Sequence, residues 1–185
     1  GGVGYEPSGG FTADGLPLSE EDHVFLEPLM KVAALCNNAR VVPPESGKKR
    51  WSVIGDPTEA ALLVAAGKWG YDARAASRDN PRRYELPFDS RRKRMSVVHA
   101  NVPKEELIAY VKGAPREVLS LCSRILINGI EAQLTDEQRE MVMSRNDDLA
   151  RSGLRVLAMA SRQLGADTDM KPEDVEKEMT FLGLM

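Results

Sequence analysis

Three short strand patterns follow one another between residues 82 and 112, and this block constrains the fold more than any other stretch. The patterns cover residues 84–87, 94–100 and 107–112, and Pro87 and Pro103 limit them because proline cannot donate to a sheet ladder. Helix patterns precede and follow the block without the regular strand and helix alternation of a parallel sheet. The sequence therefore predicts an α+β fold, with a twisted, mainly antiparallel β-sheet flanked by helices.

Local signals place the other elements. Three helix starts carry capping signals, namely Ser19 with Asp22, Asp56 with Pro57, and Thr135 with Gln138. We expect the third helix to run to about Ser152, and a short helix to follow Pro115. Asn128-Gly129 predicts a type I′ hairpin, and further strands are expected at residues 41–42, 51–54, 155–161 and 181–184. Residues 167–178 carry six acids and are predicted to be a solvated loop or surface helix.

Composition bounds the class of protein. The 185 residues, 42% hydrophobic and 29% charged, fit one globular domain. No run of about 18 apolar residues is present, so we expect no membrane-spanning segment, and the N-terminus does not have the pattern of a signal peptide. A net charge of −3 gives no reason to expect nucleic acid binding. Cys36 and Cys122 are too few for a disulfide scaffold and suggest a reducing compartment, with Cys36 as a core thiol.

Several common catalytic motifs are absent from the sequence. Gly47-Lys48-Lys49 lacks the earlier glycine and the hydroxyl of a phosphate-binding P-loop, and no dinucleotide fingerprint follows a strand. His23 and His99 do not have zinc-site spacing with the two cysteines. No nucleophile elbow is present either. This favours a binding module over a self-contained enzyme.

Two polar segments allow both a structural and a functional interpretation. At residues 55–59, Asp56 and Pro57 suffice to begin a helix, yet the Glu59 carboxylate beside Thr58 can also accept from an exocyclic amine. At residues 86–96, the four cations are typical of a charged edge strand. Alternatively, Phe88 and a cation on its face can offer a flat ring and an ammonium to one ligand.

Two glycine-containing segments leave the same choice open. At residues 111–115, Gly113 can simply end a strand before a helix that begins at Pro115. In the functional interpretation, Gly113 permits close backbone approach while Lys112 adds positive charge. Residues 153–160 are typical of a helix cap followed by a core strand, in which Arg155 is the one noteworthy residue.

Together, and in this order, the four segments resemble the nucleotide-binding domain of P-type cation-transporting ATPases. The motifs are Gly-Asp-Pro-Thr-Glu-Ala-Ala-Leu, Pro-Phe-Asp-Ser-x-Arg-Lys-Arg-Met-Ser, Val-Lys-Gly-Ala-Pro and Gly-Leu-Arg-Val-Leu-Ala-Met-Ala. The resemblance is to the type II, calcium-pump-like group with a bacterial wording, and it covers nearly the whole chain. It implies a single nucleotide-binding domain over residues 1–185, with residues 1–18 and 179–185 as the segments that connect it to a phosphorylation domain.

The resemblance also implies roles at the adenine end of an ATP site. Phe88 would stack on adenine, and Glu59, with Thr58 beside it, would meet the adenine amino group. The other residues of this part of the pocket would be Lys93, Lys112 and, for close backbone approach to the ring, Gly113.

At the other end of the nucleotide, Arg155 would reach towards the phosphates and Leu157 would pack against the base or ribose. Ser90 stands where the animal calcium pumps have an arginine. Arg91 or Arg92 are therefore the possible phosphate contacts in this segment, with no metal ligand or catalytic residue expected in the chain.

The family's phosphorylated aspartate and its Mg²⁺-binding aspartates are not among these residues. The resemblance thus implies a fragment that captures MgATP and delivers the γ-phosphoryl group to an aspartate elsewhere, without hydrolysing ATP alone. Its partners would be ATP and the phosphorylation and actuator domains of the same polypeptide, with no nucleic acid and no membrane insertion of its own. It would be a cytoplasmic domain of an integral protein of the cell membrane.

Three alternatives for the function stay open. The expected transported cation is Ca²⁺, but a domain of a proton, magnesium or sodium/potassium-type pump carries similar motifs. A non-enzymatic module that docks an acidic partner through residues 91–94 is the alternative from another class.

Overall fold

The computed structural model describes residues 4–13, 15–44, 50–165 and 167–185. The chain divides into two compact units, Gly1–Ser77 and Arg78–Met185. The prediction of a single nucleotide-binding domain over residues 1–185 stays a prediction. Within the described ranges, no helix combines the length and apolar character that crossing a bilayer requires.

The first unit is built on two helices. Its elements are β1 (Thr12–Ala13), β2 (Leu16–Pro17), α1 (Glu20–Leu35), β3 (Arg40–Val42), β4 (Ser52–Ile54) and α2 (Pro57–Lys68). The predicted capping box is present, since Ser19 Oγ accepts from the Asp22 N–H and the Asp22 carboxylate accepts from the Ser19 N–H. α1 contacts α2, and β3 pairs with β4 antiparallel. Cys36, the predicted core thiol at the end of α1, is fully buried.

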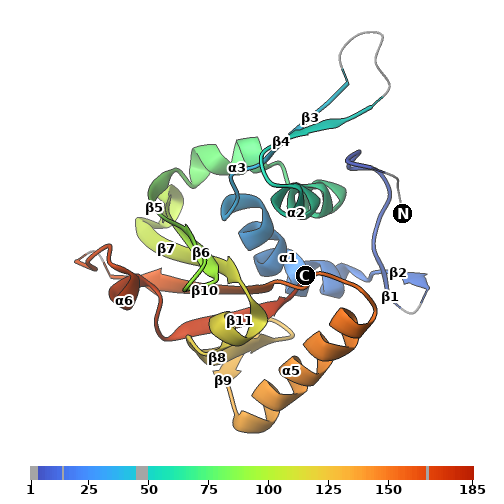
Figure 1. Cartoon of the computed structure of the whole chain (residues 1–185). Helices are drawn as coiled ribbons and strands as arrows, with labels where there is room; N and C mark the ends of the chain where they lie inside the picture. Colours follow the sequence, from blue (N-terminus) through green and yellow to red (C-terminus); the bar gives the residue numbers. More distant parts are fainter. Residues whose placement is uncertain (1–3, 14, 45–49, 166) are drawn as a thin grey trace. The chain divides into compact units, whose positions relative to one another are not determined.

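The second unit holds a seven-stranded sheet in the order β5-β6-β7-β10-β11-β8-β9 (Figure 1). Its strands are β5 (Arg82–Asp89), β6 (Arg94–Asn101), β7 (Glu106–Gly113), β8 (Cys122–Ile127), β9 (Ile130–Gln133), β10 (Ala158–Leu164) and β11 (Met179–Leu184). Every neighbouring pair is antiparallel except β11 with β8, which is parallel. The mainly antiparallel α+β prediction is therefore confirmed.

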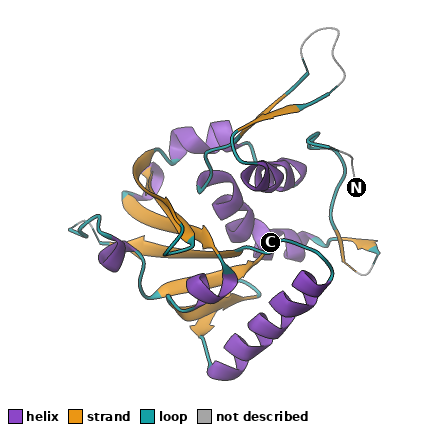
Figure 2. Ribbon diagram, viewed as in Figure 1, coloured by secondary structure: helices purple, strands orange, loops and turns teal. Residues whose placement is uncertain are grey.

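Helical segments of different lengths accompany this sheet (Figure 2). They are the 3₁₀ turn η1 (Val102–Lys104), α4 (Pro115–Leu119), α5 (Asp136–Arg151) and α6 (Pro172–Val175). Thr135 and Gln138 form the predicted capping box of α5. Gly153, with φ +76°, ends this helix and donates its N–H to the Ala150 carbonyl. α4 contacts β7, β10 and β11, and its Val118 is fully buried in the core of the unit.

Two expectations differ from the structure, and one helix was not expected. β10 begins at Ala158 and not at residue 155, because the preceding residues form the link from α5. α3 (Ala73–Asp79), which continues across the unit boundary, was not predicted, although Asp72 supplies a cap by accepting from the Ala75 N–H. Residues 167–178 are not solvated throughout, since Val175 is fully buried and Glu176 is only 4% exposed. Val175 joins the core, and Glu176 is buried against two arginines.

Candidate functional site

A β-bulge in the β5–β6 hairpin decides which face of the sheet Phe88 occupies. Leu86 and Asp89 each pair with one residue of β6, and between them Pro87 and Phe88 together oppose Met95 alone. Paired residues share a face, so Leu86 and Asp89 lie on one face while Phe88 lies with Met95 on the other. In a regular strand Phe88 would share the face of Leu86, because it is two residues further along.

The same face carries a lysine. Met95 pairs with Lys112 on β7, so Phe88, Met95 and Lys112 share one face of the sheet. Phe88 is 64% exposed, whereas Met95 and Lys112 are 3% and 5% exposed. β5 and β7 flank β6, so their backbones are about 10 Å apart. This arrangement can stack a flat ligand on the Phe88 ring and place its polar edge near a cation.

Asp89 stabilises the turn between β5 and β6 through hydrogen bonds with backbone groups of the turn. Its Oδ1 accepts from the backbone N–H groups of Arg92 and Arg91, both at 2.9 Å, and its carbonyl accepts from the Lys93 N–H at 2.6 Å. The hydrogen bonds to Oδ1 lower the pKa of the Asp89 carboxyl, and the one from Arg92 has a larger effect than the one from Arg91. Lys93 has a left-handed φ of 51°, and its Nζ lies 3.3 Å from Oε1 of Glu117 on α4. The turn thus presents Lys93 in an ion pair with α4.

Gly113 has no room for a side chain. A Cβ there would lie 2.5 Å from both the Lys93 carbonyl oxygen and the Arg94 Cβ, and 2.7 Å from the Arg94 Cα. The Lys93 carbonyl also accepts from the Ala114 N–H at 2.9 Å. The backbone that approaches Gly113 this closely is therefore that of the β5–β6 turn.

Leu157 and Arg155 lie in the link between α5 and β10. Leu157 exchanges two backbone hydrogen bonds with Met185, at 2.7 and 2.8 Å, which extends the ladder between β10 and β11. Met159 pairs with Lys112, and Leu157, two residues earlier, falls on the same face. Leu157 is half-buried, while Arg155 is exposed. The Lys112 face therefore extends to Leu157.

Thr58 and Glu59 belong to the first unit, at the start of α2. Asp56 Oδ1 accepts from the Thr58 and Glu59 N–H groups at 2.7 and 3.1 Å, as predicted for an N-cap. Glu59 Oε2 accepts from the Asn38 N–H at 3.0 Å, and the Glu59 carbonyl accepts from Asn37 Nδ2 at 2.8 Å. Glu59 thus ties α2 to the end of α1, whereas the Thr58 N–H takes part in the N-cap of α2.

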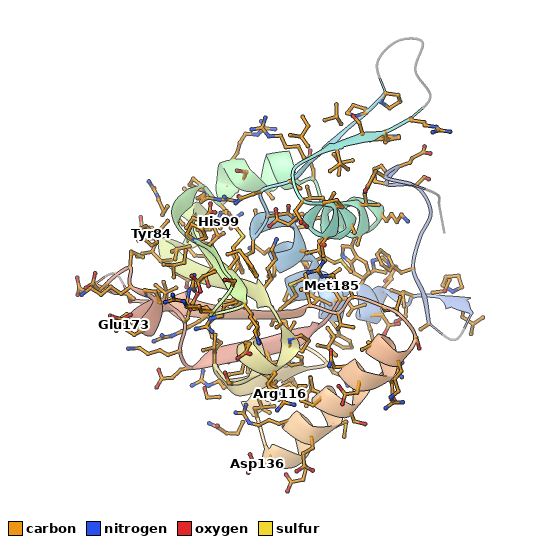
Figure 3. All side chains as sticks on the ribbon, viewed as in Figure 1. Tyr84, His99, Arg116, Asp136, Glu173 and Met185 are labelled. Carbon is orange, nitrogen blue, oxygen red and sulfur yellow. The ribbon has the colours of Figure 1, made fainter. Side chains whose placement is uncertain are left out.

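Glu176, which sequence reasoning missed, lies beneath the β5–β6 turn. It follows α6, the helix marked by Glu173 in Figure 3. Its carboxylate accepts from Arg92 Nη1 and Ser96 Oγ at 2.5 Å and from Arg94 Nε at 2.8 Å. The prediction of a solvated acidic stretch concealed it, although Val175 within this stretch and Met179 next to it are apolar and gave a signal of burial.

The cations of residues 91–94 are therefore not equivalent. Arg92 and Arg94 have side chains that are 23% and 16% exposed and are bound to Glu176. Arg91 is exposed, and Lys93 is paired with Glu117. The run is thus not a continuous basic surface.

Metal ligands are a separate question. Among the residues whose positions the structure gives, His, Cys, Asp and Glu nowhere form a group of three or more that could hold a metal ion. Cys122 does not offer a thiolate, because burial raises its pKa to about 12.

Known proteins place these features in a family. Residues 25–185 match the family model described as P-type ATPase, cytoplasmic domain N. The chain is 36% identical over 183 residues to a calcium-transporting ATPase of Bacillus subtilis, which covers 99% of this chain and 20% of that protein. It is 37% identical over 161 residues to the sodium/potassium exporting P-type ATPase cta3 of Schizosaccharomyces pombe, covering 85% of this chain and 15% of the relative.

A mammalian relative shows the same pattern. The calcium-transporting ATPase type 2C member 1 of Bos taurus is 32% identical over 191 residues, covering 100% of this chain and 17% of its own length. The chain therefore spans about a fifth or less of the length of these relatives. Because the family model covers most of its residues, the chain belongs to the P-type ATPase cytoplasmic domain N family.

Proposed function

We propose that this chain binds ATP by its adenosine end and presents the γ-phosphoryl group to an aspartate on another domain of the same polypeptide. The observation that carries this proposal is the face shared by Phe88, Met95 and Lys112, where an exposed ring and a buried lysine lie on the two strands that flank β6. Stacking of a base on an aromatic side chain contributes about 1–3 kcal/mol. Membership of an ATPase family supports ATP as the ligand.

The proposed site residues of the second unit then have defined tasks. Adenine stacks on Phe88 above Met95, and Lys112 meets its polar edge. Leu157, on the same face, packs against the base or ribose. Arg155, which is exposed, reaches towards the phosphates.

The β5–β6 turn, together with Gly113, against which it packs, completes this part of the site. Lys93 lines the pocket from its ion pair with Glu117. Gly113 serves the site by letting the turn approach β7 closely. Arg92 is left out of the proposal because Glu176 holds it, and Arg91 is the exposed candidate for phosphate contact. Thr58 and Glu59 stay predictions from their motif.

The nucleotide is proposed to arrive as MgATP, but the described residues do not supply a metal site of their own. No step is therefore assigned to a metal held by this chain. What its own residues do is bind and orient: they fix the adenosine end, and the triphosphate remains available to a neighbouring domain. The chain alone is expected to bind ATP without hydrolysing it.

The remaining features concern the whole protein, because this chain spans only about a fifth or less of the length of these relatives. We propose that the phosphorylation and actuator domains lie in the same polypeptide and that this domain is on the cytoplasmic side of a cell membrane. Ca²⁺ is the proposed cargo, because relatives from Bacillus subtilis and Bos taurus are described as calcium-transporting. The Schizosaccharomyces pombe relative keeps sodium or potassium as the alternative. ATP-driven uptake of labelled Ca²⁺ by vesicles containing the full-length protein tests this choice, and uptake of Na⁺ or K⁺ in its place would contradict it.

The alternative of a protein-docking module has less support. It needs residues 91–94 to act as an exposed basic patch, yet Arg92 and Arg94 are bound to a carboxylate of their own unit. Charge reversal at Arg91 should therefore leave any acidic partner's binding almost unchanged. Loss of such binding in this variant, with no response to ATP, would favour the docking module.

Titration of the ¹⁵N-labelled chain with ATP tests the proposed function. Association costs about 4–15 kcal/mol, which one stack and a few polar contacts only just exceed. We expect a dissociation constant from millimolar to high micromolar, about −4 to −6 kcal/mol. Amide resonances of Phe88, Lys112 and Gly113 should shift with ATP and with adenosine, but not with tripolyphosphate. No shift at these amides in about 10 mM ATP, or equal shifts with tripolyphosphate, would contradict binding by the adenosine end.

A further inference from the structure

We propose that Glu176 is the positioning residue of this nucleotide site. Its carboxylate holds the β5–β6 turn, through Arg92, in the geometry that turns Phe88 to the Lys112 face. The inference rests on the proposed function, because it assigns Glu176 a role in nucleotide affinity as well as in stability.

The carboxylate of Glu176 is enclosed by three donors. Its side chain is 0% exposed, and it accepts from Arg92, Arg94 and Ser96. Arg94 and Ser96 are on β6, and Arg92 is in the turn itself. A carboxylate that is bound by two guanidinium groups in a buried place forms strong, charge-assisted hydrogen bonds. One side chain thus joins the turn to the first strand after it.

Arg92 carries this constraint to the bulge. While Nη1 binds Glu176, Nη2 donates to the Pro87 carbonyl at 2.8 Å. Pro87 and Phe88 are the two bulge residues that oppose Met95. The guanidinium therefore bridges the buried carboxylate and the backbone immediately before Phe88. This bridge stabilises the bulge, and the bulge puts Phe88 on the face of Lys112.

Glu176 is itself held in place by the backbone around it. Its N–H donates to the Pro172 carbonyl at 2.8 Å at the end of α6, and Val175, just before it, is fully buried in the core. The Met179 N–H donates to the Leu121 carbonyl at 2.9 Å, where β11 begins. The carboxylate thus acts from a fixed point of the unit, 84 residues from Arg92 along the chain.

The test compares ATP and adenosine binding in Glu176→Gln, Arg92→Met and Leu164→Ala. The glutamine keeps the shape but turns an amide NH₂ towards guanidinium donors, and the methionine removes the bridge from the turn side. Leu164→Ala is the control for lost stability. Leu164 is buried in the core at the end of β10, about 20 Å along the strand from Ala158, the residue that pairs with Gly113.

We expect Glu176→Gln and Arg92→Met to weaken ATP and adenosine by the same factor, about two- to ten-fold, because the ligand must then order the Phe88 segment on binding. The free variants should show shifted amide resonances at residues 88–93. Leu164→Ala should lower Tm and leave both affinities unchanged. If Glu176→Gln does not fold, the affinities of Arg92→Met alone decide whether the bridge from Glu176 to the turn supports nucleotide binding.

Two results would overturn the inference. In a folded variant, unchanged affinity would mean that Glu176 acts on stability alone. In Arg92→Met, loss of ATP affinity with adenosine binding intact would mean that Arg92 contacts phosphate directly. Failure of the proposed function itself would look different, because the unmodified chain would then bind neither ATP nor adenosine.

Discussion

Two hairpins of the seven-stranded sheet, β5–β6 and β8–β9, close in different ways. The β8–β9 turn is built by its own residues, since Asn128 and Gly129 take φ values of 49° and 78°. Its neighbouring ion pair, Arg124 with Glu131 at 3.4 Å, is exposed. A bulge precedes the β5–β6 turn, and the turn depends on the buried carboxylate of Glu176 from a distant part of the chain.

The β5–β6 hairpin shows how a sheet can present a side chain that regular alternation of faces would hide. The β8–β9 hairpin, which has a local turn, keeps a regular register, so its residues alternate between the faces. Its second strand, β9, is exposed throughout. The bulge before the β5–β6 turn breaks this alternation and moves Phe88 away from the face of Leu86. Phe88, the ring that we propose stacks on the ligand, is thus on the hairpin whose geometry depends on a residue outside it.

The largest expected effect is on stability, at the buried carboxylate. Glu176→Ala should lower the free energy of unfolding by about 3–5 kcal/mol, because two partly buried guanidinium groups lose their partner. Arg124→Ala, the matched change at the other hairpin, should cost about 0–1 kcal/mol because its ion pair is exposed. Urea denaturation measures both, and similar costs for the two variants would remove the distinction between the hairpins.

Phe88→Ala should act on binding and not on stability. We expect ATP affinity to fall by about 1–3 kcal/mol, because stacking on the ring is lost. The unfolding free energy should change little, since Phe88 is 64% exposed. Tyr84→Ala is the matched control, because Tyr84 is another exposed aromatic residue of β5, labelled in Figure 3. Calorimetry that finds equal losses in the two variants would refute the assignment of Phe88.

A smaller, local effect is expected at the second turn. Gly129→Ala should lower the unfolding free energy by about 1–2 kcal/mol, because a side chain is strained at its φ of 78°. ATP affinity should be unchanged, since nothing in the proposed site depends on this turn. A changed affinity in the folded variant would show that the two hairpins are coupled.

The smallest effect is a difference in pH response. Hydrogen bonds from the Arg92 and Arg91 N–H groups depress the pKa of the Asp89 carboxyl below its ordinary value of 3.8. A carboxyl whose pKa is depressed in the folded state stabilises that state above its unfolded pKa, and the contribution is lost as the pH falls through the folded pKa. The β5–β6 turn should therefore loosen only below pH 3.8, whereas Asn128 and Gly129 do not titrate.

Amide spectra recorded as the pH is lowered measure this contrast. The Arg91 and Arg92 resonances should move below pH 3.8, and Asp89→Asn should remove that step. A transition of these amides above pH 3.8, or an equal one at Gly129, would mean that Asp89 does not hold the turn.

Much of the fold could be predicted because its signals are local. Ser19 and Asp22, Thr135 and Gln138, and Asn128 with Gly129 each fix a helix start or a turn within four residues, and all three are confirmed. The mainly antiparallel sheet followed from strand patterns of the same kind. The start of α3 also has a local signal, the Asp72 cap.

The rest depended on contacts between distant residues. The bulge at Pro87 and Phe88 is a property of the pairing with Met95, which strand alternation does not reveal. Glu176 looked like one more acid of a solvated run, because its arginine partners lie more than 80 residues away. The motif resemblance indicated Phe88 and Lys112, but only the register shows that they share a face.

Binding of adenine on the Phe88 and Lys112 face would give intermolecular nuclear Overhauser effects between the base and these two side chains. With the chain saturated by ATP, we expect contacts from the adenine H2 or H8 proton to the Phe88 ring and the Lys112 side chain. Contacts to Arg92 or Ser96, which lie on the Glu176 side, or none to Phe88 at saturation, would contradict it.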